Sequence, residues 1–102
     1  MLQLRPVCEH CGMALPPASG EAMICSYECT LCQACVEAVL HTVCPNCGGG
    51  FCPRPVRPAR NLRGGNYLGN HPASDRAVFK PVDPQAHERF SAALRQILPQ
   101  KR

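Results

Sequence analysis

The sequence predicts a small metal-stabilised α+β fold with two four-cysteine zinc sites, one short helix, an extended tail and a C-terminal helix. Eight of its nine cysteines form four closely spaced pairs, which is the ligand count for two tetrahedral all-thiolate zinc sites. Tryptophan is absent and only five of the 102 residues are Phe or Tyr, so large core-filling side chains are scarce. A core this thin needs metal or cross-links to be stable. The pairs are Cys8/Cys11, Cys25/Cys29, Cys32/Cys35 and Cys44/Cys47.

Zinc is favoured over disulfides by the start of the chain. The opening MLQLRP has neither the apolar run nor the cleavage site of a signal peptide, and no window approaches the ~18 apolar residues of a membrane span. We therefore expect a cytoplasmic protein, and in a reducing compartment C-x2-C pairs favour metal. The alternatives are a secreted disulfide knot without its leader and iron in place of zinc, since four thiolates also bind iron.

The first elements surround the first cysteine pair. Residues 2–7 alternate briefly and are expected to be a short strand or extended lead-in. Cys8–Gly12 is typical of a zinc knuckle, with a glycine where the backbone must turn. Residues 13–22 contain two prolines and a glycine and predict a loop. A short strand at Met23–Ile24 is expected to lead into Cys25.

A helix of two to three turns is predicted after Cys32, because apolar residues recur there at helical spacing. The apolar stripe consists of Val36, Val39, Leu40 and Val43, and the polar face would carry Glu37, His41 and Thr42. Pro45 should end this helix, since proline disfavours a helical residue before it. Cys44–Gly48 is a second knuckle.

The chain divides into three parts by composition. Residues 1–53 form the two-zinc module, residues 54–65 a basic Pro/Arg/Gly linker that is extended and mobile, and residues 66–102 a tail. An amphipathic helix is predicted at about 84–98, with Asp83 as its N-cap. Its apolar face, either an ordinary packing face or a surface for a partner groove, consists of Ala86, Phe90, Ala93, Leu94, Ile97 and Leu98.

The cysteine pairs could share metals in two ways. A sequential partition joins the first two pairs and the last two. An interleaved partition joins Cys8/Cys11 to Cys32/Cys35, and Cys25/Cys29 to Cys44/Cys47. We favour the interleaved partition, because a knuckle, a hairpin and a ligand pair at a helix start make a treble clef.

The order and spacing of the ligands resemble those of RING fingers. The pattern C-x2-C-x13-C-x3-C-x2-C-x2-C-x8-C-P-x-C lies within RING spacing, although Cys29 stands where RING domains usually have histidine. More closely, MLxLRPxCExC…ICSxECTxCxxCVExVLHxxCPNCGG is similar to a family of small bacterial proteins with a RING-like zinc fold and no assigned function. This resemblance covers about residues 1–58. It implies a RING-like, cross-braced fold and no particular activity.

The charge is distributed unevenly. The first fifty residues hold one arginine and four glutamates, for a net charge of −3, whereas the remainder holds ten basic and three acidic residues, for +7. An acidic metal module therefore carries a basic tail, which either folds back on the module or meets an acidic partner.

A binding module is the predicted function, because no catalytic constellation is apparent and a zinc ion with four cysteine ligands has no open position. We expect a structural module that binds a protein partner, with no small-molecule substrate and no membrane. One alternative is a RING-type ubiquitin-ligase-like adaptor, although Glu9 and Gly48 stand where RING ligases usually have an apolar and a basic residue. The other is nucleic-acid binding through the basic tail. Cys52 is expected to be a spare thiol, and His10 and His41 are not needed as ligands.

Overall fold

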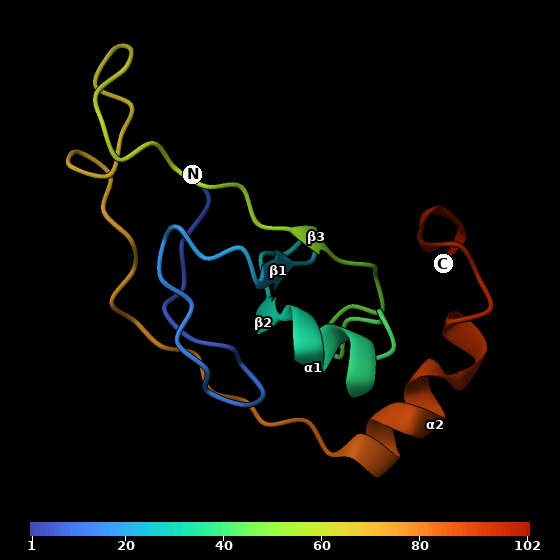
Figure 1. The fold of residues 1–102 in the computed structure, drawn as a ribbon. Coiled ribbons are helices and arrows are strands. Elements are labelled where there is room, and N and C mark those ends of the chain that lie inside the picture. Colours follow the sequence, from blue (N-terminus) through green and yellow to red (C-terminus); the bar gives the residue numbers. More distant parts are fainter.

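The computed structural model describes residues 1–102 and places a small antiparallel sheet at the centre of the molecule (Figure 1). Strands β1 (Ala22–Ile24) and β2 (Thr30–Cys32) form a hairpin, with Met23 opposite Leu31. The hairpin strand expected at Met23–Ile24 is thus confirmed. A third strand, β3 (Cys52–Pro53), pairs with the other edge of β1 and gives the order β2-β1-β3.

The core is as thin as the composition predicted, with 19 of 102 residues buried. Its main cluster mixes cysteines with a few aliphatic side chains around β2 and the first helix. Leu15, Leu31, Val36 and Leu40 are its largest members, and six of the eleven residues in the cluster are cysteines. The apolar interior and the cysteine clusters are therefore one structure.

Helix α1 (Gln33–Ala38) begins where expected but is shorter than the two to three turns predicted. The backbone N–H groups of Val39 and Leu40 both bond to the carbonyl of Cys35, and His41 and Thr42 then take left-handed φ angles of 52° and 61°. Such angles are uncommon for side chains other than glycine and interrupt a right-handed helix. The apolar stripe itself was predicted correctly, because Leu40 and Val43 are both buried in the turn after the helix.

Helix α2 (Pro84–Leu94) begins at the predicted N-cap, where the Asp83 carboxylate accepts a hydrogen bond of 3.0 Å from the backbone N–H of Gln85. It ends about four residues earlier than predicted, and Pro99 begins a short 3-10 helix, η1 (Pro99–Lys101), rather than ending α2. The face turned inward also differs from the predicted apolar stripe. His87 and Ser91 are buried, whereas Phe90 is 48% and Leu98 59% exposed.

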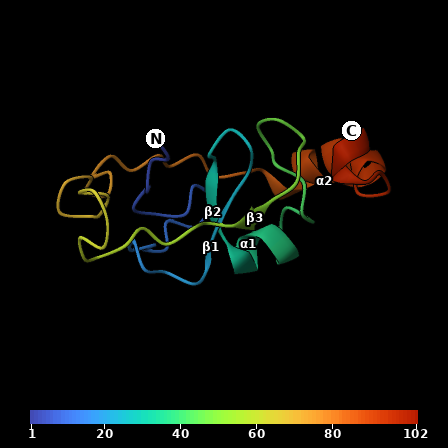
Figure 2. The same ribbon diagram turned by 90° about the horizontal axis from the view of Figure 1, so that it is seen from above.

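The tail wraps around the module. The stretch after β3 runs to a loop at one end of the molecule, returns along the N-terminal segment and reaches α2 at the opposite end (Figures 1 and 2). This path gives the molecule extents of 45 × 27 × 18 Å. No helix is both long and apolar enough to cross a membrane.

Candidate metal centre

Four sulfur atoms meet at the junction of the first knuckle with β2 and α1. The Sγ atoms of Cys8, Cys11, Cys32 and Cys35 all lie within 4.8 Å of one another. Cys11 Sγ and Cys32 Sγ are 3.8 Å apart. A tetrahedral ion with Zn–S bonds of about 2.3 Å requires sulfur atoms roughly 3.8 Å apart, so this spacing fits zinc. Only Cys11 is exposed, which leaves the cluster largely shielded from solvent.

A second cluster forms where the turn between β1 and β2 meets the second knuckle. The Sγ atoms of Cys25, Cys44 and Cys47 lie within 4.8 Å of one another. Cys29, expected as the fourth ligand, is not part of this group. The Sγ of Cys29 accepts a hydrogen bond of 3.3 Å from Asn46 Nδ2. The Cys29 thiol is nevertheless close enough to Cys25 to act to lower the pKa of the Cys25 thiol. The second cluster thus has three gathered sulfurs and a fourth nearby.

The sulfur positions follow the interleaved grouping rather than the sequential one. The first knuckle meets the cysteines at the start of α1, and Cys25 from the β1–β2 turn meets the second knuckle. All nine cysteines are free thiols, and Cys52 on β3 is exposed and belongs to neither cluster. Along the chain, α1 therefore connects the two clusters, because it contains Cys35 of the first and is followed by Cys44 of the second.

The two knuckles have the same backbone geometry. Gly12 and Gly48 each follow the second cysteine of a knuckle with φ of +77°. Their N–H groups bond to the carbonyls of Cys8 and Cys44, at 3.0 and 2.8 Å. A side chain would be strained at this φ, which explains the glycine at both positions.

The thiol groups differ in their pKa values. Burial raises the pKa of Cys35 and of Cys44. Burial also acts to raise the pKa of Cys8, but backbone N–H groups, chiefly those of Cys11 and Cys32, outweigh it and lower the pKa. Each cluster thus contains a thiol that keeps its proton at neutral pH. A metal that binds as a thiolate complex must displace these protons.

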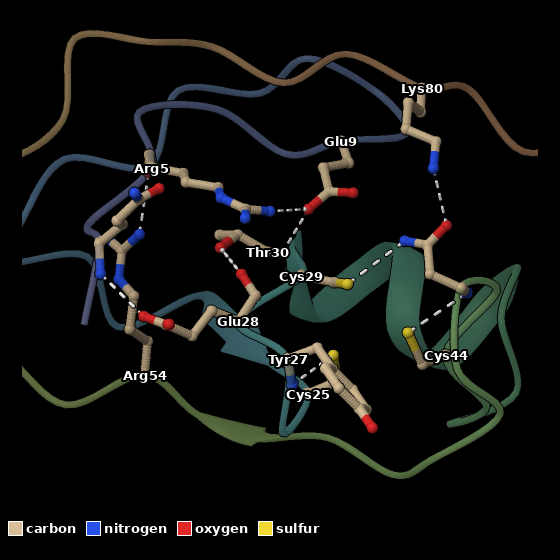
Figure 3. A network of polar contacts seen from close by, with 12 residues as sticks. Arg5, Glu9, Cys25, Tyr27, Glu28, Cys29, Thr30, Cys44, Arg54 and Lys80 are labelled. Carbon is tan, nitrogen blue, oxygen red and sulfur yellow. Dashed lines mark hydrogen bonds and ion pairs between the residues drawn. The ribbon is translucent and has the colours of Figure 1, made fainter. Parts of the chain in front are cut away.

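Glu9, inside the first knuckle, is buried and joins the knuckle to the sheet. Its Oε2 accepts hydrogen bonds of 2.9 Å from Arg5 Nη1 and 2.7 Å from the backbone N–H of Thr30 (Figure 3). The charge of this carboxylate is thereby offset by Arg5 inside the protein. The sequence offered only the i,i+4 spacing of the two residues as a signal of this contact.

Arg54 is a second contact that the sequence did not reveal. It lies in the stretch predicted as an extended, mobile linker, yet it is 4% exposed. Its guanidinium donates to the carbonyls of Arg5, Leu15 and Pro16, at 2.9, 3.1 and 3.0 Å. No carboxylate pairs with it, and burial lowers its pKa. Arg57 similarly donates to the carbonyl of Leu2 in the N-terminal segment, and to that of His71 at 2.7 Å. These arginines attach the tail to the N-terminal segment.

The histidines make structural contacts. Nδ1 of His10 accepts from the backbone N–H of Val82 at 2.9 Å, and Nε2 of His41 lies 3.3 Å from a carboxylate oxygen of Glu88. His87, which no sequence pattern marked as buried, has Nε2 2.8 Å from the carbonyl oxygen of Leu40. None of the three joins a sulfur cluster.

Comparison with known proteins relates the N-terminal half to one family. The family described as "Protein of unknown function (DUF1272)" matches residues 1–57. An uncharacterised protein of Rhizobium meliloti (strain 1021) is 53% identical over 81 residues, which cover 79% of this chain and 89% of that protein. No solved structure matches the chain.

Proposed function

The chain belongs to this family of proteins of unknown function, DUF1272, and we propose that it is a non-catalytic, zinc-stabilised module that binds another protein. In this proposal the fold is a RING-like, cross-braced treble clef around two structural zinc ions. The first ion is held by Cys8, Cys11, Cys32 and Cys35. The second is held by Cys25, Cys29, Cys44 and Cys47.

The observation that carries the proposal is the geometry of the first cluster. Its four sulfurs are mutually close, and the 3.8 Å between Cys11 and Cys32 suits a tetrahedral zinc ion. At the second cluster, Cys29 follows Cys25 by four residues and lies close to its thiol, and it would supply the fourth ligand. Cysteine in all four positions leaves no place for water or substrate, so both ions would be structural.

Zinc binding would supply much of the folding free energy. Structural zinc contributes apparent binding energies on the order of 10–16 kcal/mol per ion in zinc-finger peptides. Because only 19 residues are buried, a contribution of this size would dominate the stability of the module. The free thiols also suit a reducing compartment, and we place the protein in the cytoplasm.

A protein partner is supported by the apolar side chains left exposed along the tail. Phe79 is 60%, Phe90 48% and Leu98 59% exposed. Large apolar and aromatic side chains are those that protein interfaces favour. Nucleic-acid binding is less well supported, because Arg54 and Arg57 are occupied by backbone carbonyls of the protein itself.

Metal content is the first test. Mass spectrometry under native and denaturing conditions, with elemental analysis, is expected to find two zinc ions per chain and one in Cys44→Ser. Complete chelation with reductant should abolish NMR dispersion over residues 7–48. A chain without metal, or one that keeps its fold after chelation, would contradict the proposal.

The interaction is tested by partner capture with two double variants. A specific protein partner should be lost in Phe90→Ser combined with Leu98→Ser, and retained in Arg60→Ala combined with Arg63→Ala. Arg60 and Arg63 are exposed, so these two changes remove charge without disturbing the fold. Binding to random nucleic acid that weakens steeply with salt and is lost in the arginine variant would favour the nucleic-acid function instead.

A further inference from the structure

Residues Lys80–Val82 of the tail cross both knuckles. The backbone N–H of Lys80 donates to the carbonyl of Glu9 at 2.8 Å, and that of Val82 to His10 Nδ1 at 2.9 Å. On the second knuckle, Lys80 Nζ donates to Asn46 Oδ1 at 2.9 Å (Figure 3). His10 and Asn46 occupy the same place in their knuckles, directly before the second cysteine. One short stretch of the tail is therefore hydrogen-bonded to both knuckles.

Asn46, which accepts the hydrogen bond from Lys80, is also bonded to two sulfur atoms at the second cluster. Its side-chain Nδ2 donates to Cys29 Sγ at 3.3 Å, and its backbone N–H donates to Cys44 Sγ at 3.4 Å. The first of these bonds depends on how the amide is turned, because the other end of the amide is an acceptor. An amide turned the other way would point its oxygen at the Cys29 sulfur and repel a thiolate.

We infer that Lys80 is a positioning residue for the second metal site: its bond to Asn46 Oδ1 keeps Nδ2 directed at Cys29, the ligand that is not gathered with the other three sulfurs. This inference rests on the proposed zinc binding. Groups that orient metal ligands through hydrogen bonds change metal affinity by about 10–100-fold when they are removed. The seating of the tail would thus decide how firmly the second ion is held.

The effect passes through the hydrogen bond to Asn46 rather than through the charge of Lys80 acting across space. A cavity of about 190 Å³ lies between Lys80, Pro81 and Val82 on the tail and Glu9 and Asn46 on the knuckles. The Lys80–Asn46 bond is exposed, so water and salt screen the ammonium charge. Any side chain at position 80 that still donates a hydrogen bond to Asn46 should therefore preserve the second metal site.

Release of zinc to a chelator from the full-length two-zinc protein tests the inference. Lys80→Met is expected to speed the loss of one zinc about tenfold, and to leave the other at its wild-type rate. Alkylation followed by mass spectrometry should then find Cys29 modified first among the eight paired cysteines, while the exposed Cys52 reacts equally in every variant. Lys80→Arg should restore the wild-type rate. Lys101→Met is the matched control, since Lys101 is the only other lysine and is exposed.

The outcomes separate the inference from the proposed function. If Lys80→Met releases both ions at wild-type rates, or speeds both equally, the positioning role is wrong while zinc binding stands. If the wild-type chain binds no zinc, the proposed function is wrong and the inference falls with it. Asn46→Asp provides a second check, because it removes the donor to Cys29 while keeping the backbone N–H of residue 46. It should release the same ion at least as fast as Lys80→Met.

Discussion

Replacement of Arg54 by methionine should destabilise the zinc-loaded protein by about 3–4 kcal/mol. Methionine keeps much of the apolar stem but removes all donors. The bond to the Leu15 carbonyl is buried, and the loss of a charged donor to a buried acceptor costs about 2 kcal/mol. The carbonyls of Arg5 and Pro16 are partly buried and can regain water, so each adds roughly 0.5–1 kcal/mol.

The measurement is thermal unfolding followed by circular dichroism, in excess zinc and reductant. A loss of 3 kcal/mol should lower Tm by about 12 °C or more for a domain of this size. Arg60→Met is the control, since Arg60 is exposed and close in sequence. If Arg54→Met and Arg60→Met lower Tm equally, or Arg54→Met costs less than about 0.5 kcal/mol, then Arg54 does not fasten the tail as its contacts indicate.

Three further predictions concern the knuckles, the helix and the metals. Gly48→Ala should cost about 1–2 kcal/mol, because φ there is +77°; an unchanged denaturation midpoint would contradict this. The hydrogen bond from Arg95 lowers the pKa of the exposed Glu88. The contribution of this pair to folding stability is therefore present above the ordinary glutamate pKa and is lost as pH falls through the lowered value. An NMR titration should therefore find the Glu88 pKa raised in Arg95→Met and unchanged in Lys101→Met. Burial raises the pKa of Cys35 and Cys44, so zinc binding should release protons and should weaken as pH falls. Calorimetry in buffers of different ionisation heat measures this proton release, and finding none would refute the prediction.

The sulfur clusters were the part of the structure that the sequence predicted best. Cysteine spacing restricts which thiols can meet, and a helix start after Cys32 made the interleaved grouping preferable to the sequential one. The exception is Cys29, whose Sγ accepts a hydrogen bond from the Asn46 amide, and that amide in turn accepts one from Lys80. Lys80 is 34 residues away from Asn46 in the chain, and no local sequence pattern predicts such a contact.

Helix ends and tail contacts were harder to predict, because distant groups decide them. The α1 stripe correctly marked Leu40 and Val43 as buried, but periodicity could not reveal that the chain turns through left-handed angles at His41 and Thr42. Arg54 looked like one of several arginines in a polar stretch. Its burial depends on three carbonyls that the loop before β1 and the N-terminal segment leave facing it.

The late position of Arg54 also sets an order of events during synthesis on the ribosome. The carbonyl of Pro16 lies 38 residues before the arginine that satisfies it. At 5–20 residues per second, translation leaves that loop without its partner for roughly 2–8 s. All eight paired cysteines are made within this interval or before it, since Cys47 precedes Arg54. Metal capture can therefore come first in the nascent chain, and the arginine then closes a module that has already taken shape.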